Sequence, residues 1–329
     1  MADVLWWALD EIRLKVIGRD ARYSRLVLEL ARNPGTATDA TLAVELLTVG
    51  LANRPWLSAP IGSVVLVAPG GTDHPAVGPV ADTVREQWPA ATLTVLDETV
   101  AALLGAAPDP EPAACVVVHQ DAVRTSVGLV AARAAVAGDF VAGGARGLAD
   151  RVIEHLRAEH RLDTGLHEAW AAVVHDGAFA PPAPRRGAVH GSPIVEGRTG
   201  PLPSGTVTLG AAELHAVLAP AYRQVADLVA RVLRDAPSEA VRQARAGGLL
   251  LTGTHPPGAD THLAGLTGLP AHRAAEPRSG SHHPEVLLNG VARLLPDPPP
   301  RPATPPPPEL LALMDRLLPP RRRPPPAKG

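Results

Sequence analysis

Short apolar runs alternate with longer amphipathic stretches along most of the chain, and this alternation limits the fold more than any other feature. Valine and leucine fill the runs at 63–69, 91–96, 115–119, 125–130 and 248–253, which are short enough to be buried strands. The spacing of apolar residues predicts helices over 39–52, 75–88, 98–107, 148–162 and 211–234. We also expect 115–119 and 125–130 to form a hairpin, with further strands at 133–140 and 206–209. Strands mixed with helices in this way predict an α/β fold.

Proline divides the chain unevenly. Residues 296–329 hold 14 of the 37 prolines, and such a segment cannot form a helix or a sheet. We expect a disordered tail there, either passive or acting as a docking segment for a proline-recognising partner. A second stretch rich in proline and glycine, 180–205, predicts a subdomain boundary.

Charge and composition exclude several classes of protein. The chain has 31 Lys+Arg against 33 Asp+Glu, a formal charge of -2, so it cannot coat nucleic acid by bulk electrostatics. Apolar runs fall well short of the ~20 residues that cross a bilayer. The single cysteine, Cys115, excludes disulfide frameworks and cysteine zinc sites. Acidic residues near the start, where a secretory signal is basic, lead us to expect a cytoplasmic protein.

Common catalytic motifs are absent from the sequence. It contains no G-x-S-x-G elbow and no G-x-x-x-x-G-K-[ST] loop, which excludes serine hydrolases of that type and P-loop enzymes. His155 and His160 fall in one predicted helix but are five residues apart. Because helix neighbours are three or four residues apart, we expect these histidines on different faces and predict no metal site.

Three separated pieces of the chain together resemble one family. VVLVAPGGTD and TLTVLDETVAALLGA lie within 64–106, VVVHQDAVRTSVGLV begins the piece at 116–177, and TVTLGAAELHAVLAPAYRQVADLVARVLRDAP begins the piece at 206–292. Each resembles a segment of the MreB family of bacterial actin-like proteins, and their order agrees over 38–295.

This resemblance implies an actin-like ATPase fold with two lobes, each built around a mixed sheet. Residues 1–110 would form the first lobe, 111–180 with 247–295 the sheet of the second lobe, 181–246 a small helical subdomain, and 296–329 the tail. Only residues 14–38 fill the place of an extra subdomain that helps the family to polymerise. We therefore expect that subdomain to be reduced or missing, with LVLEL as one strand.

The cofactor implied by the resemblance is Mg-ATP, which proteins of this fold hold between glycine-rich turns. Glu98 matches the family's catalytic glutamate. The positions that match its nucleotide-binding residues are Asp10, Gly143, Gly144 and Gly253.

Most of the phosphate-binding pattern is missing, however. The first loop, 10–13, has no glycine, and the second, 119–124, has His119 in place of an aspartate and no glycine either. Pro256 and Pro257 replace glycines in the third loop. Glycines there let backbone N–H groups approach phosphates, so we predict that ATP binding is weak or lost and expect no cofactor unless the family activity is retained. Arg13 and Arg124 could offer charge to an anion, but we expect both on the surface.

The resemblance implies a cytoskeletal or scaffold protein of cell shape or envelope morphogenesis, with partners in that machinery and with self-association. Two alternatives stay open: an active ATPase in which Glu98 positions water, and a platform that binds partners through the proline-rich tail. Trp56 and Leu57 match an apolar pair with which the family contacts the inner face of the membrane. Alternatively, Trp56 caps the core where a strand begins.

Overall fold

The computed structural model describes residues 7–9, 12–20, 23–30, 61–75, 77–106, 112–174, 179, 194–199, 202–274, 286–287 and 290–291. Two units divide the chain, Met1–Leu294 and Leu295–Gly329, and the described residues all belong to the first. Several sequence predictions lie outside these residues: the helix at 39–52, Asp10, the pair Trp56 and Leu57, and the tail.

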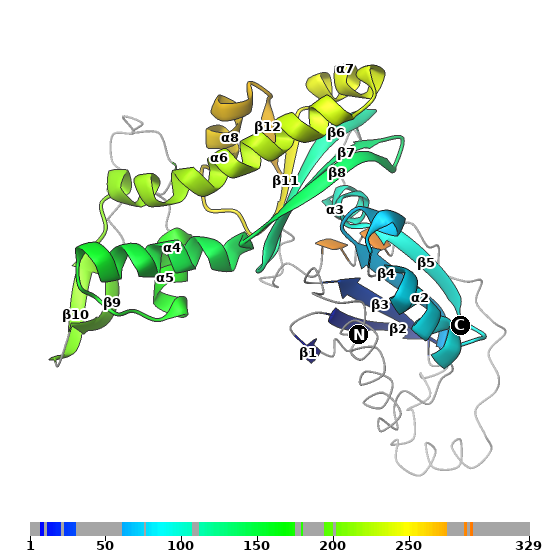
Figure 1. The fold of residues 1–329 in the computed structure, drawn as a ribbon, viewed down its shortest axis with the longest axis horizontal. Coiled ribbons are helices and arrows are strands. Elements are labelled where there is room, and N and C mark those ends of the chain that lie inside the picture. Colours follow the sequence, from blue (N-terminus) through cyan, green and yellow to red (C-terminus); the bar gives the residue numbers. More distant parts are fainter. Residues whose placement is uncertain are drawn as a thin grey trace, which may run out of the picture. The chain divides into compact units, whose positions relative to one another are not determined.

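The first of two five-stranded sheets has the strand order β1-β2-β3-β4-β5 (Figure 1). These strands are β1 (Trp7–Leu9), β2 (Ile12–Asp20), β3 (Tyr23–Leu30), β4 (Ile61–Ala68) and β5 (Thr92–Asp97). The β1–β2 and β2–β3 pairs are antiparallel, whereas the β3–β4 and β4–β5 pairs are parallel. A short 3-10 turn, η2 (Gly71–Asp73), and helix α2 (Val77–Gln87) connect the two parallel strands β4 and β5.

The second sheet has the order β12-β11-β6-β7-β8. Its strands are β6 (Ala114–Gln120), β7 (Arg124–Ala131), β8 (Ala134–Ala142), β11 (Leu249–Gly253) and β12 (Ala271–Arg273). Strands β6, β7 and β8 form an antiparallel meander that includes the predicted hairpin, and β11 and β12 join it in parallel. Both sheets are thus mixed, as predicted, and the chain has the α/β fold.

The remaining elements are mostly helices. They are α3 (Glu98–Ala106), α4 (Gly144–Glu159), α5 (Leu166–Val173), α6 (Ala211–Asp235), α7 (Ser238–Gly247) and α8 (Ala259–Thr267). A separate hairpin pairs β9 (Ile194–Thr199) with β10 (Leu202–Thr208). Strand β9 was not predicted, because it lies in the stretch 180–205 that its prolines and glycines mark as a boundary. None of the helices described here is long and apolar enough to cross a membrane.

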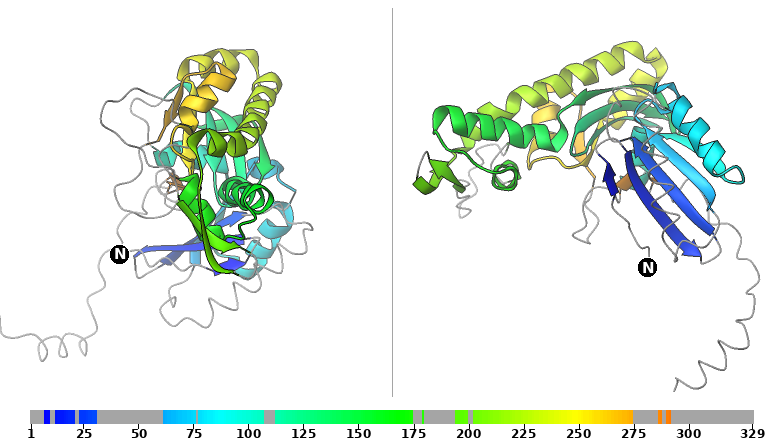
Figure 2. Two further views of the ribbon diagram at one scale, coloured as in Figure 1. Left: turned by 90° about the vertical axis from the view of Figure 1, so that its left-hand side faces the viewer. Right: turned by 60° about the horizontal axis from the view of Figure 1, so that its bottom comes forward.

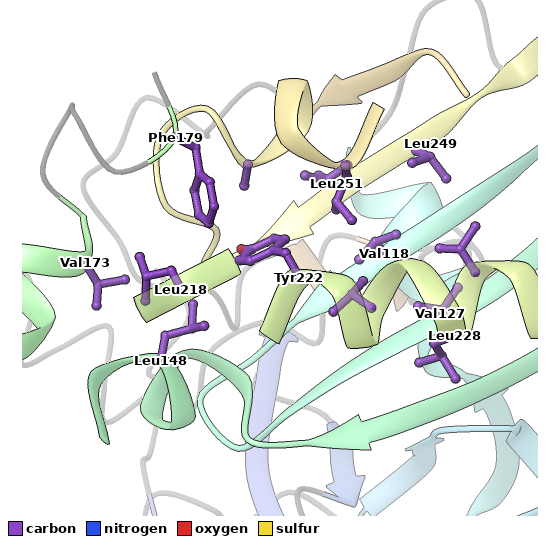
Figure 3. Close-up of a cluster of buried hydrophobic side chains, with 14 of the residues drawn as sticks. Val118, Val127, Leu148, Val173, Phe179, Leu218, Tyr222, Leu228, Leu249 and Leu251 are labelled. Carbon is purple, nitrogen blue, oxygen red and sulfur yellow. The ribbon is translucent and has the colours of Figure 1, made fainter. Parts of the chain in front are cut away.

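Opposite faces of the second sheet pack against different helices. Side chains alternate between the two faces of a strand, so Val118 and Val127 point into a core with α4 and α6 (Figure 3). Leu148 of α4 and Leu228 of α6 complete this layer (Figure 3). Figure 2 shows from two further sides how α6 runs along the sheet.

The other face of β7 packs against α3. A Cβ built on Gly128 would lie 2.2 Å from Thr99 Oγ1, so glycine is required for α3 to approach the strand this closely. This approach brings the first turn of α3 over the strands β6 and β7 and positions the candidate site.

Candidate functional site

The predicted site residues reach one region around the turn between β6 and β7. Glu98 is the first residue of α3, Gly143 caps α4, and Gly144 begins it. A Cβ on Gly144 would lie 2.5 Å from the backbone nitrogen of Arg124, in that turn. Gly253 ends β11 and pairs with Gln120, which ends β6. Asp10 lies outside the described residues.

Asp97, the last residue of β5, holds the beginning of α3 in place. Its Oδ1 accepts hydrogen bonds from the backbone N–H groups of Thr99 (2.7 Å) and Val100 (3.3 Å). A side-chain oxygen that accepts from the first turn in this way stabilises a helix start, typically by about 1 kcal/mol. This helix cap therefore holds the first turn of α3, from which the side chain of Glu98 projects.

Glu98 is completely buried and surrounded by polar groups of the second sheet. Its Oε2 accepts hydrogen bonds from Arg124 Nε (3.1 Å), Arg124 Nη2 (2.9 Å) and Ser126 Oγ (2.9 Å). His119 Nε2 lies 3.6 Å from Oε1. Arg124 is only 3% exposed, so the expectation of a surface arginine was wrong. The error arose because the carboxylate that holds Arg124 belongs to Glu98, 26 residues earlier in the chain, and the sequence does not show that the fold brings the two together.

Burial and the neighbouring groups shift the pKa of Glu98 in opposite directions. Burial raises the pKa of Glu98, since a charged carboxylate loses its hydration there. Arg124 lowers that pKa, Asp121 raises it, and the hydrogen bond from Ser126 lowers it. Because Oε2 already accepts three hydrogen bonds, this oxygen is engaged with protein donors rather than directed at a water or substrate.

Asp121 organises the β6–β7 turn itself. Its Oδ1 accepts hydrogen bonds from the backbone N–H groups of Val123 (2.6 Å) and Arg124 (2.7 Å). In a glycine-rich phosphate loop, successive backbone N–H groups point at the anion. Here an aspartate of the same turn already takes two of these donors, and its carboxylate adds negative charge to the turn.

The beginning of α4 is also closed by this turn. Ala145 N–H donates to Asp121 O and Arg146 N–H to Ala122 O, both at 2.8 Å. Gly143 and Gly144 have φ angles of 118° and 35°, which a residue with a side chain rarely adopts. The predicted glycine pair therefore allows the turn to cover the helix start, and two N–H donors of its first turn are satisfied by carbonyl oxygens.

The third loop, which follows β11, is held by one backbone hydrogen bond and by contacts of the His255 ring. Thr254 N–H donates to Gln120 O (2.8 Å), and Gly253 has a φ of 89°. His255 is buried, with Nδ1 3.2 Å from the hydroxyl of Tyr222 and Nε2 3.1 Å from the carbonyl oxygen of Thr252. Burial also raises the pKa of Tyr222 far above its usual range. This loop thus contributes a packed histidine directly before Pro256 and Pro257.

A cavity of about 270 Å³ lies between the beginning of α4 and the middle of α6. Gly143 and Gly147 of α4 line one side, and Tyr222 and Val225 of α6 line the other. Its volume is just below the range of about 300–1,000 Å³ that is typical of ligand pockets.

A second cluster, at the other end of α4, was missed by sequence reasoning. His155 Nε2 lies 2.7 Å and His160 Nε2 2.6 Å from the same oxygen, Glu213 Oε1. The expectation that these histidines lie on different faces of one helix did not foresee that both rings approach the same carboxylate. His160 caps α4 where the chain leaves the helix, and a carboxylate from α6 can meet both rings from outside it. Hydrogen bonds from His155 and then His160 lower the pKa of Glu213.

Comparisons with solved structures agree on the fold. Two structures of MreB5 of Spiroplasma citri, one bound to ADP and one to AMPPNP, are each 17% identical to this chain, with TM-scores of 0.59 and 0.62. Both alignments cover 82% of this chain and 78% of the MreB5 chain. The MamK double helical filament is 15% identical over 80% of this chain and 78% of the MamK chain, with a TM-score of 0.57.

Sequence comparison identifies the family more directly. No curated protein matches the chain significantly. The profile of the MreB/Mbl protein family, however, matches residues 16–283, which is most of the chain and includes both sheets except β1 and the beginning of β2. Together with the fold, this match shows that the chain belongs to the MreB/Mbl family of actin-like cytoskeletal proteins.

Proposed function

We propose that this chain is an MreB-like scaffold that self-associates without an ATPase cycle and organises cell shape or the cell envelope. One observation carries the proposal: Arg124 and Ser126 donate hydrogen bonds to Oε2 of Glu98, the residue that matches the family's catalytic glutamate. A glutamate held in a buried ion pair is poorly suited to orient an attacking water.

The geometry of the loops supports the same conclusion. Mg-ATP brings several negative charges, which need backbone N–H donors and a cation. The donors of the β6–β7 turn are taken by Asp121 Oδ1, and those at the start of α4 are taken by carbonyl oxygens of the turn. The β6–β7 turn and the start of α4 therefore do not fit the phosphates.

Self-association is proposed from the relatives. MamK forms a double helical filament on this fold, and MreB5 binds ADP and AMPPNP. We infer that this chain retained the assembling surfaces while its nucleotide site closed. Pelleting of the purified full chain, with and without Mg-ATP, tests this directly. We expect equal polymer in both samples, and assembly that requires Mg-ATP would contradict the proposal.

Calorimetric titration with Mg-ATP tests the site itself. We expect the wild-type chain to give no binding in the micromolar range and no phosphate release above a protein-free blank. The double variant Asp121→Gly/Arg124→Thr frees the two backbone donors and releases Glu98, so we expect it to bind Mg-ATP measurably more tightly.

The chain offers a matched control for this variant. Arg157 and Asp163 form an ion pair of 2.7 Å whose side chains are 63% and 66% exposed. Asp163→Gly/Arg157→Thr repeats the same two changes on the surface and should leave titration and phosphate release unchanged. Micromolar binding by the wild type, or phosphate release that Glu98→Gln abolishes, would instead support an active ATPase.

A further inference from the structure

Three side chains from two helices converge at the outer end of α4. The imidazole–carboxylate cluster consists of His155, His160 and Glu213, whose ligand atoms all lie within 4.8 Å of one another. Both Nε2 atoms approach one carboxylate oxygen, at 2.7 and 2.6 Å, and the two rings meet edge to face with centroids 5.7 Å apart. Two imidazole nitrogens and one carboxylate oxygen thus converge on one point.

The backbone explains why these side chains meet. His155 lies in the last two turns of α4, and His160 caps the same helix, donating its N–H to Leu156 O. Glu213 is the third residue of α6, where its other oxygen, Oε2, faces the N–H of Gly210 at 3.4 Å. The carboxylate is therefore held by the start of one helix, and the imidazoles are held by the end of another.

This ligand set is one that zinc prefers. Zn²⁺ binds imidazole nitrogen and carboxylate oxygen at about 2.0–2.2 Å, and three protein ligands with a water complete a tetrahedron. Ligand atoms in such a tetrahedron lie about 3.3 Å apart, so the two Nε2···Oε1 contacts would have to lengthen by about 0.6 Å. Small rotations of these side chains supply that change.

The cluster is also accessible to an ion. The side chains of His155, His160 and Glu213 are 22%, 30% and 30% exposed, so a hydrated cation can reach them without opening the core. By contrast, the cluster around Glu98 is closed to solvent and already contains a cationic group, Arg124. Of the described residues, this half-exposed trio is the one set of His, Cys, Asp or Glu that converges closely enough to hold a metal.

We propose that His155, His160 and Glu213 form a Zn²⁺ site that ties the end of α4 to the beginning of α6. The ion replaces the two hydrogen bonds with three coordinate bonds, and a water fills the fourth position. Because only the folded chain brings the three residues together, binding stabilises the fold in proportion to the logarithm of the zinc concentration.

Calorimetric titration of the untagged, chelator-treated full chain with ZnCl₂ tests the proposal. We expect one Zn²⁺ per chain and a rise in melting temperature with zinc, whereas MgCl₂ gives neither because Mg²⁺ prefers an all-oxygen shell. Glu213→Gln, His155→Gln and His160→Gln should each weaken zinc binding by at least about tenfold, since even residues behind the ligands have effects of 10–100-fold. His167→Gln, at an exposed histidine of α5, is the matched control and should bind as the wild type does.

A second measurement does not depend on the variants folding. Co²⁺ substituted for Zn²⁺ should give the visible absorption of a tetrahedral nitrogen and oxygen site in the wild-type chain, and Zn²⁺ should displace it. Absence of zinc binding by the wild type would overturn the proposal. Wild-type affinity in folded Glu213→Gln and His155→Gln would overturn it equally, because the ion would then bind elsewhere.

Discussion

Two clusters of ionisable side chains lie at opposite ends of helix α4, and they differ in almost every physical respect. At its beginning, the turn that carries Arg124 presents a guanidinium to Glu98, and both side chains are at most 4% exposed. At its end, His155 and His160 share Glu213, and all three side chains are between 22% and 30% exposed. The first cluster is assembled from helix α3 and strand β7, and the second from the end of α4 and the beginning of α6.

This difference shows how burial decides what a charged cluster can do. A buried pair cannot exchange its partners for water, so Glu98 and Arg124 stabilise each other and are closed to a ligand. A half-exposed cluster exchanges its hydrogen bonds at low cost, so Glu213 can accept a cation instead. A glutamate is thus enclosed by protein groups at one end of the helix and partly open to solvent at the other.

The largest effect is expected from breaking the buried cluster. Arg124→Ala leaves the carboxylate of Glu98 buried without its cation, and breaking a pair of this kind costs about 3–5 kcal/mol. Urea unfolding followed by circular dichroism measures the loss. The exposed Arg157→Ala is the control, and equal stability of the two variants would show that the buried pair contributes no more than a surface pair.

The second prediction replaces both charged residues of the buried pair together, so that neither charge is left without its partner. Glu98→Gln/Arg124→Met removes both charges together, and exchanges of this kind are often neutral or stabilising. We expect the double variant to recover most of the stability that Arg124→Ala loses. A double variant as unstable as the single one would mean that packing, and not charge, sets the cost.

A smaller loss of stability is expected from a substitution at Gly144, the first residue of α4. Gly144→Ala places a Cβ 2.5 Å from Arg124 N and Asp121 O at a φ of 35°, so either the turn or the helix start must shift. Strain of this kind costs about 1–3 kcal/mol. Gly147→Ala, whose added Cβ meets nothing within 4 Å, is the control in the same helix. Equal unfolding midpoints for the two variants would contradict a tight fit between α4 and the turn.

The partly exposed cluster of His155, His160 and Glu213 should contribute less to the free energy of unfolding than the buried pair does. In chelator, Glu213→Gln weakens two hydrogen bonds to imidazoles in a partly solvated place, and we expect a loss of about 0.2–1 kcal/mol. Thermal unfolding measures it, with Glu239→Gln on the surface of α7 as the control. A loss as large as that of Arg124→Ala would contradict the contrast between the two clusters.

The smallest effect concerns pH. Burial, with His215 and Arg223 nearby, lowers the pKa of His262, which stacks on Phe179. The unfolded chain then binds the proton more readily, so stability should fall as pH drops through the ordinary value near 6.5. His262→Phe should flatten this slope, whereas the exposed His167→Phe should keep it. A slope unchanged by His262→Phe would assign the acid sensitivity to other groups.

Much of the fold could be predicted from the sequence because its signals are local. The apolar run at 115–119 and the helical spacing at 211–234 each specify an element through side-chain period alone, and β6 and α6 lie where predicted. Strand β9 was missed because glycine and proline around it suggest a loop. The α/β class and the actin-like fold follow from the order of these elements, and both are confirmed.

The site was harder to predict because its contacts are not local. Glu98 was identified by resemblance, but its partner Arg124 was assigned to the surface, since the two residues are 26 positions apart and only the fold brings them together. His155 and His160 were judged on one helix, whereas Glu213 comes from another more than fifty residues later. A helix rule describes neighbours along one axis and cannot foresee a side chain that arrives from a second element.

Helix α4 has 16 residues, so its ends are about 24 Å apart. At that separation the two clusters share no side chain, and free-energy changes made at each end should add. A substitution in the β6–β7 turn should therefore not alter the effect of a substitution at His155 or His160 on the free energy of unfolding. The length of α4 therefore keeps the contacts of the buried pair Glu98 and Arg124 separate from those of His155, His160 and Glu213.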